Sequence, residues 1–146
     1  MRLRKGGVNT ACAVSGVPSG PMEVRSYRDL EVWSKALDFG VEIYRLTGNF
    51  PREENWGLRG QIRRAATSVA LNLAEGHSRS GTKEFLRFVS IALGSLAETE
   101  TLLIFSNRLG HLSDHETDSL MRQSQEIGRM ARGLQQALNR RLKTKV

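Results

Sequence analysis

Apolar residues recur along the chain at intervals of three and four, the spacing that places side chains on one face of an α-helix. Four segments show this pattern, and glycine, asparagine or proline lies between them. The first segment predicts a helix from about Leu30 to Leu46, with Ser26 and Asp29 as capping side chains for its free amides. Its apolar stripe should consist of Leu30, Trp33, Leu37, Val41 and Tyr44.

The second segment predicts a helix from about Glu53 to Glu75. Glu53 and Glu54 suit the positive end of a helix dipole, and Gly76 is expected to end the helix. Its seam should contain Leu58, Ile62, Ala65 and Val69, and the next step of the repeat falls on a polar residue, Asn72.

The third and fourth segments carry the longest regular repeats. After a loop at residues 77–81, a helix should run to about Asn107 with a stripe of Phe85, Val89, Ala92, Leu96, Thr99 and Leu103. Ser113 and Glu116 have the spacing of a capping box, so the fourth helix should begin there and fray near Arg141. Its stripe should be Leu120, Ser124, Ile127, Ala131, Leu134 and Leu138.

Four amphipathic helices with short connections predict an all-α fold, an antiparallel up-down-up-down four-helix bundle over residues 26–146. The second and third helices are rich in small residues, which let two backbones approach closely. We therefore expect them to be the tightest pair. The small residues are Ala65, Ala66, Ala70 and Ala74 in one helix and Ala92, Gly94, Ser95 and Ala97 in the other.

Residues 1–25 show no helical or strand period and are expected to form a disordered leader, with Met22 as an alternative start. Cys12 is the only cysteine, which excludes an internal disulfide and a thiolate metal cluster within one chain. No run approaches the ~20 apolar residues that span a bilayer, so no membrane partner is expected. We expect a cytoplasmic protein.

The formal net charge of the chain is +7. From Leu120 to the C-terminus, Glu126 is the only acid among many basic residues. Such a segment can meet phosphates or an acidic protein surface. The alternative is a solvated helix end, where the dipole also favours cations.

A motif in the second helix resembles the signature of the four-helix bundle proteins found in intervening sequences of bacterial 23S rRNA genes. The matching residues are Gln61, Arg64, Ala65, Ser68, Asn72, Leu73, Ala74, Glu75 and Gly76. Residues 27–33, 84–88 and 92–98 also resemble the family. The resemblance covers roughly residues 26–142 and is specific in order and spacing.

The resemblance implies a cytosolic four-helix bundle that assembles as a ring-like homopentamer. It also implies kinship with the accessory protein of diversity-generating retroelements, a basic bundle that contacts nucleic acid and a reverse transcriptase. The family has no established biochemical activity, so the resemblance predicts an architecture more than a reaction.

Five basic residues are the candidates for nucleic-acid contact, because arginine can bind a phosphate with two donors at once. Arg59 and Arg63 lie one helical turn apart, and the other three should continue the same positive surface into the third helix. The alternative is solvated charge that pairs with Glu84 or with a neighbouring subunit. The five are Arg59, Arg63, Arg79, Lys83 and Arg87.

Six residues of the motif and its neighbourhood are expected to form a structural polar network. A buried Asn72 needs hydrogen-bond partners, and Ser68 and Glu75 lie nearby on the helix. Arg64 and Glu98 should form an ion pair between helices. A ligand-binding cluster of Ser68, Asn72 and Glu75 is the alternative. The six are Gln61, Arg64, Ser68, Asn72, Glu75 and Glu98.

His111 and His115 lie four residues apart beside two aspartates, but the serine cap already explains this segment, and no metal or other cofactor is expected. No nucleophile elbow or phosphate-binding loop occurs, so an enzyme is not expected. The sequence favours a non-enzymatic, homo-oligomeric module that binds RNA, DNA or a nucleic-acid-processing protein. The alternative is a structural or protein-docking module that binds no nucleic acid.

Overall fold

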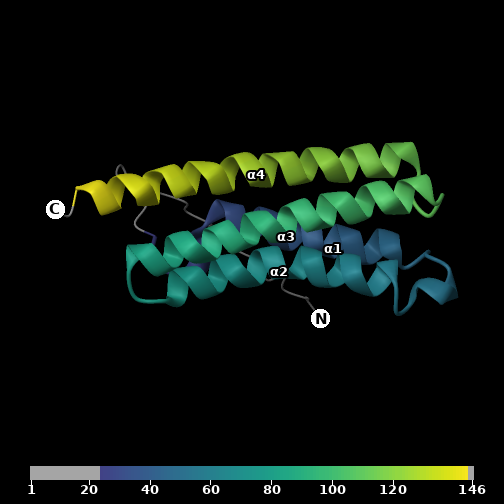
Figure 1. Cartoon of the computed structure of the whole chain (residues 1–146), viewed down its shortest axis with the longest axis horizontal. Helices are drawn as coiled ribbons and strands as arrows, with labels where there is room; N and C mark the ends of the chain where they lie inside the picture. The colour runs from purple at the N-terminus through teal and green to yellow at the C-terminus, as the bar shows by residue number, and fades with distance from the viewer. Residues whose placement is uncertain (1–23, 145–146) are drawn as a thin grey trace, which may run out of the picture.

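The computed structural model describes residues 24–144, and this part of the chain is almost entirely helical (Figure 1). Four long helices follow one another: α1 (Glu31–Thr47), α2 (Leu58–Ser78), α3 (Thr82–Arg108) and α4 (Asp114–Lys143). Two short 3-10 helices, η1 (Tyr27–Asp29) and η2 (Arg52–Glu54), precede α1 and α2. The predicted all-α fold is confirmed.

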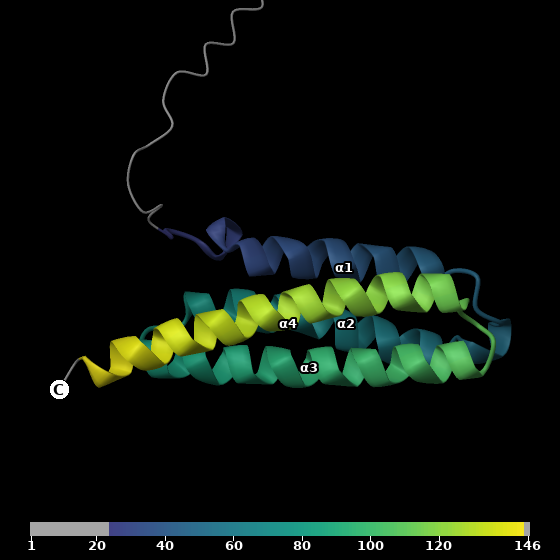
Figure 2. The same cartoon turned by 90° about the horizontal axis from the view of Figure 1, so that it is seen from above.

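The four helices lie side by side as an antiparallel bundle, which Figure 2 shows from above. Contacts join α1 to α2, α2 to α3, α3 to α4 and α4 back to α1, while the diagonal pairs do not contact each other. The most extensive contact is between α2 and α3, as the small residues predicted. The short connections between successive helices enforce the alternating directions.

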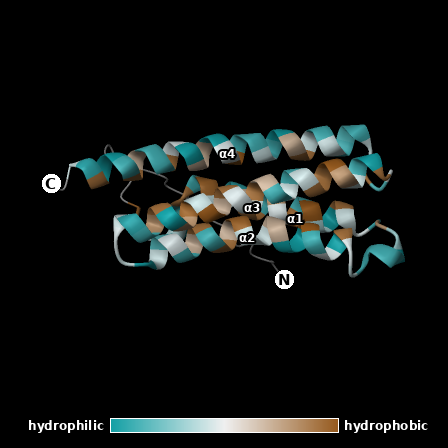
Figure 3. Ribbon diagram, viewed as in Figure 1, coloured by the Kyte–Doolittle hydropathy of each residue, from teal (hydrophilic) through white to brown (hydrophobic). Residues whose placement is uncertain are grey.

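The core contains one apolar stripe from each helix. Val89, Leu96 and Leu103 of α3 and Leu120 and Ile127 of α4 are buried, as their repeats predicted. Polar colouring dominates the surface of α4, while apolar colouring is concentrated in the helices beneath it (Figure 3). Burial of these side chains supplies most of the favourable free energy of folding, because each stabilises by about 1.5–3 kcal/mol when fully removed from water.

The predicted apolar stripe of α1 is wrong in phase. Its buried residues are Val32, Ala36, Phe39, Gly40, Ile43 and Thr47. Leu37, Val41 and Tyr44 lie outside, and their side chains are 46%, 64% and 47% exposed. Two apolar stripes at helical spacing share this helix, and only one of them faces the core.

The starts of α1 and α2 also differ from the prediction. Ser26 and Asp29 form a capping box on η1, one turn before α1. α2 begins at Leu58, because residues 52–54 form a separate 3-10 turn. Glu54 nevertheless serves the helix, since its Oε2 accepts a hydrogen bond of 2.8 Å from the backbone N–H of Leu58. The acid acts as a side-chain cap from upstream.

Gly76 lies within α2 and does not end it, since the helix continues to Ser78. A Cβ atom at Gly76 would lie 2.5 Å from Cβ of Phe88 and 3.0 Å from Cδ2 of Phe85. The glycine therefore allows the close approach of α2 and α3 at this level. It is a packing residue rather than a helix stop.

Ser113 caps α4 as predicted, with its Oγ accepting a 3.1 Å hydrogen bond from the backbone N–H of Glu116. In a full capping box, the Glu116 carboxylate would accept a hydrogen bond from the backbone N–H of Ser113. Here it accepts one from Oγ of Ser113 instead, at 3.0 Å. The predicted cap is thus confirmed in its first half only.

Helix α3 is more apolar than expected from the search for long apolar runs in the sequence. Its length and composition alone are sufficient for a membrane-spanning helix, with a mean hydropathy of 1.5 in its most apolar window. In the bundle, α3 packs against both α2 and α4. A core helix explains the same composition.

The leader lies almost wholly outside the described residues, and so do Cys12 and Met22.

Candidate assembly groove and cationic surfaces

An apolar groove of about 520 Å³ runs between α1 and α2. The exposed stripe of α1 forms one wall, and Leu71, 66% exposed, stands on the other. No charged residue of the described part of the chain lines the groove. Its lining residues are Ala36, Leu37, Gly40, Val41, Tyr44, Thr67, Ala70 and Leu71. The predicted apolar stripe of the first helix had assigned three of them, Leu37, Val41 and Tyr44, to the core.

Arg59 and Arg63 bind the C-terminal end of α1, where helix carbonyls lack partners within the helix. Nε of Arg59 donates to the carbonyl of Thr47 at 2.9 Å, and its Nη2 donates to the carbonyl of Phe50. Arg63 donates to Oγ1 of Thr47 and to the carbonyl of Tyr44, both at 2.9 Å. These guanidinium groups act as caps that join α1 to α2.

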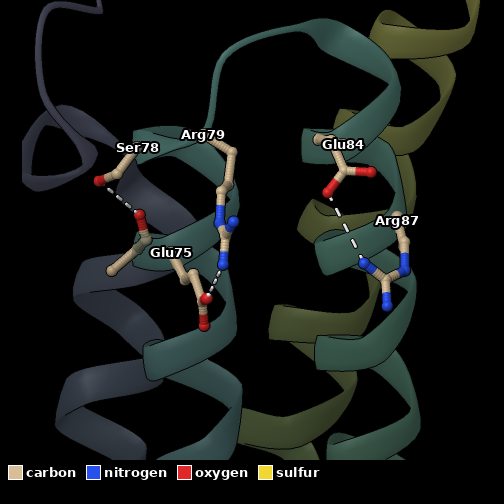
Figure 4. Close-up of polar contacts among 6 residues, drawn as sticks. Glu75, Ser78, Arg79, Glu84 and Arg87 are labelled. Atoms are coloured by element: carbon tan, nitrogen blue, oxygen red, sulfur yellow. Dashed lines mark hydrogen bonds and ion pairs between the residues drawn. The ribbon is translucent and has the colours of Figure 1, made fainter.

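Arg79, Lys83 and Arg87 lie at the opposite end of α2, around the α2–α3 loop. Figure 4 shows Arg79 paired with Glu75 at 2.8 Å and Arg87 paired with Glu84 at 3.6 Å. The hydrogen bond to Glu75, together with its negative charge, raises the pKa of Arg79. Lys83 is exposed.

One continuous positive surface through all five predicted residues is therefore wrong. The α2 helix has 21 residues and spans about 30 Å, so Arg59 and Arg79 stand at its two ends. The sequence showed which residues share a face, but it did not show that the α1 terminus occupies the arginines at one end.

A hydrogen-bonded polar network joins α2 to α3, as expected of Ser68 and Asn72. Nδ2 of Asn72 donates to the carbonyl of Ser68 at 2.7 Å and to its Oγ at 2.9 Å. Oγ of Ser95 in α3 donates to Oγ of Ser68 at 3.0 Å. Ser95 thus belongs to the network, although the sequence predicted for it only a close contact between helices. Glu75 pairs with Arg79 and stands outside this network.

The predicted ion pair between Arg64 and Glu98 does not form in the described part of the chain. Both side chains are exposed, as is Gln61. Ala65, Leu73 and Gly76 of the motif are buried, whereas its polar residues are exposed or half-buried, so the polar part of the motif lies toward solvent. Water solvates these charges there, which removes the need for a partner.

The outward face of α4 carries five exposed cations: Arg122, Arg129, Arg132, Arg140 and Lys143. At 100° per residue they fall within a sector of about 80°, and they extend over about 32 Å. None of them forms an ion pair within residues 24–144. Glu126, the only acid after Asp118, instead pairs with Lys35 of α1 at 3.4 Å. The C-terminal charge excess in the sequence signalled this surface.

The two histidines that were considered as metal ligands do not meet. Nε2 of His111 lies 3.6 Å from Oε1 of Glu54, and its ring lies 5.4 Å from that of Phe50. His115 is exposed on the first turn of α4. Among residues 24–144, no group of three or more metal-ligating side chains gathers.

Comparisons with known proteins agree with the geometry of the bundle. Residues 28–133 match the family model described as 23S rRNA-intervening sequence protein. No curated protein matches the chain significantly. A solved structure from Bacteroides thetaiotaomicron is similar, with a TM-score of 0.65 and 26% identity over 71% of this chain and 97% of that one. That structure is described as a protein of unknown function from the S23 ribosomal protein family.

Proposed function

Because the chain belongs to the 23S rRNA-intervening sequence protein family, we propose that it is a non-enzymatic, homo-oligomeric module that binds nucleic acid along α4. The observation that carries the proposal is the apolar groove between α1 and α2. A helix that is apolar on two faces needs a second partner for the face that the bundle leaves in water.

A second copy of the chain is the occupant that the surface favours. Helix α3 presents Phe105 and Leu109, which are 56% and 59% exposed and lie four residues apart on one helix face. Insertion of this ridge into the groove of the next copy would be a contact between two different surfaces. Contacts of that type close into rings when the rotation between copies allows. The expected ring is a pentamer.

Sedimentation velocity tests this assembly with a matched pair of variants. Leu71→Glu places a charge in the groove, and Gln61→Glu places the same charge on the same helix outside it. We expect Leu71→Glu to sediment as a single chain, because burial of an unpaired carboxylate is strongly unfavourable. Gln61→Glu should sediment like the wild type. Equal behaviour of the two variants would contradict assembly through the groove.

Nucleic-acid binding is assigned to the five cations of the α4 face. Their extended arrangement suits a phosphate backbone, and the absence of paired acids leaves the whole charge available. Arg59 and Arg63 do not favour phosphate contact, because their donors already bind carbonyl and hydroxyl groups. Lys83 and the two paired arginines near the α2–α3 loop can add charge at the end of the bundle.

The salt dependence of binding tests this surface. We expect the affinity for a single-stranded oligonucleotide to fall with rising salt, because bound cations release counterions from the phosphates. The triple variant Arg122→Gln, Arg129→Gln, Arg132→Gln should reduce the log–log slope by about 2. Fluorescence anisotropy at several salt concentrations measures both slopes. An unchanged slope would remove α4 from the interface.

A protein-docking module without nucleic-acid binding is the second candidate, and the same apolar groove favours it. If no RNA or DNA binds even at low salt, this candidate stands alone.

A further inference from the structure

A second hollow, of about 560 Å³, lies at the end of the bundle where Val24 and Leu30, on either side of η1, approach the α2–α3 loop and the last turns of α4. Its volume falls within the range of small-molecule sites, which is roughly 300–1,000 Å³. Phe85, Leu134 and Leu138 belong to its apolar lining, and Arg79, Arg141 and His77 are the ionisable side chains among its described lining residues. Among residues 24–144, no acidic side chain lines the hollow. Its lining therefore suits a ligand with an anionic group and an apolar, flat part.

The two arginines have donors to spare. A guanidinium group has five N–H donors, and Arg79 donates one hydrogen bond, from Nη2 to Oε1 of Glu75 (Figure 4). Arg141 is exposed and forms no ion pair within residues 24–144. Together they present bidentate donors of the kind that bind phosphate oxygens.

Phe85 supplies an aromatic surface in the same hollow. It is half-buried, and the ring of His77 meets it edge-on, with centroids 5.5 Å apart and an interplanar angle of 87°. Base stacking on aromatic side chains is a common means of holding single-stranded nucleic acid, and it tolerates any base. No such platform accompanies the five cations of α4 themselves.

The hollow lies where the cationic face of α4 ends. Arg140 belongs to that face, and Arg141, the next residue, lines the hollow. Arg141 lies about 100° around the helix axis from Arg140, so a strand that follows the cationic face reaches the hollow by turning around the last turns of α4. The hollow matches one nucleotide in size, charge and aromatic character.

We propose that the hollow binds the terminal nucleotide of a single strand through a phosphomonoester at that end, which rests on the proposed binding along α4. A phosphomonoester carries a charge of about −1.5 to −2 at pH 7, more than the single charge of each internal phosphodiester. Arg79 and Arg141 consequently favour a phosphorylated end over a hydroxyl end. The site selects an end of the strand, whereas the α4 face binds any sequence.

Three single-stranded oligonucleotides of the same sequence test the proposal: one with a 5′-phosphate, one with a 3′-phosphate and one with hydroxyl groups at both ends. Each is prepared as DNA and as RNA, with a fluorophore at an internal base, and anisotropy gives its dissociation constant for the full chain. The wild type should bind one phosphorylated form about tenfold more tightly than the hydroxyl form, as expected for an added charge-assisted contact.

Two variants and one control locate the effect. Arg141→Gln should abolish the preference, and so should Thr82→Glu, which places a carboxylate in the hollow at a first-turn position where acids stabilise a helix. Arg132→Gln, on the α4 face, should lower the affinity for all three oligonucleotides by the same factor.

Equal affinities of the wild type for the three oligonucleotides would overturn the proposal that the hollow binds a strand end, and would leave binding along α4 intact. Loss of binding to all three at low salt would overturn both proposals. A preference that survives in both Arg141→Gln and Thr82→Glu would also overturn the terminal site.

Discussion

At the scale of single residues, Gly76 shows how one position controls the approach of two helices. Gly76→Ala should destabilise the bundle by about 1–3 kcal/mol, because the new methyl group would overlap Phe88 and force the helices apart. Gly94→Ala is the matched control in α3, where a Cβ meets nothing within 4 Å. That variant should stabilise by about 0.5–1 kcal/mol. Urea unfolding measures both, and equal effects would contradict the packing role of Gly76.

Neighbouring arginines in α2 have opposite roles at the same scale. Arg63 binds the end of α1 and lies over the ring of Tyr44, with its Cζ 4.4 Å from the ring centroid. The side chain of Arg64 is exposed and forms no hydrogen bond or ion pair in the described part of the chain. Arg63→Gln should cost about 1–3 kcal/mol, because Oγ1 of the buried Thr47 and the carbonyl of Tyr44 lose their donor. Arg64→Gln should change stability by less than about 0.5 kcal/mol. Thermal or urea unfolding that ranked the two alike would contradict the capping role.

At the scale of elements, α1 shows what a sequence pattern can and cannot decide. Leu37, Val41 and Tyr44 recur at helical spacing, and so do Val32, Ala36, Phe39 and Ile43. Each set predicts the same helix, but only contacts with α2 and α4 decide which set is buried. In α3 and α4 the regular repeat coincides with the buried stripe, so the sequence predicted both the helix and its buried face, and Ile91, Ile104 and Phe105 are the exposed large apolar residues of α3.

For the candidate surfaces too, the sequence predicted some features, and contacts between helices decided the others. The C-terminal charge excess predicted a cationic α4, because a helix beyond Asp118 with one acid cannot pair its own cations. The hydrogen bonds of Arg59 and Arg63 were not predictable, since they depend on where the end of α1 and the turn after it place three carbonyl groups. The ion pair of Arg64 and Glu98 failed for a related reason: neighbouring helices were predicted correctly, but the rotation of each helix about its axis was not.

At the scale of the whole molecule, the bundle divides its surface by chemistry. The apolar groove lies between α1 and α2, and the cationic face belongs to α4 on the other side of the core. The terminal hollow lies at one end, where residues of α2, α3 and α4 meet. A ring that buried the groove and left α4 in solvent would repeat the cationic face in every copy. Repetition of a weak site raises the avidity for a long strand without any new contact.

Native mass spectrometry of the wild-type protein at micromolar concentration shows directly whether the apolar groove is buried between copies of this chain. We expect a particle whose mass is a whole-number multiple of the 16.3 kDa chain, with five copies. A spectrum that contained only the single chain would mean that Leu37, Val41 and Leu71 stay in water and that the groove joins no second copy.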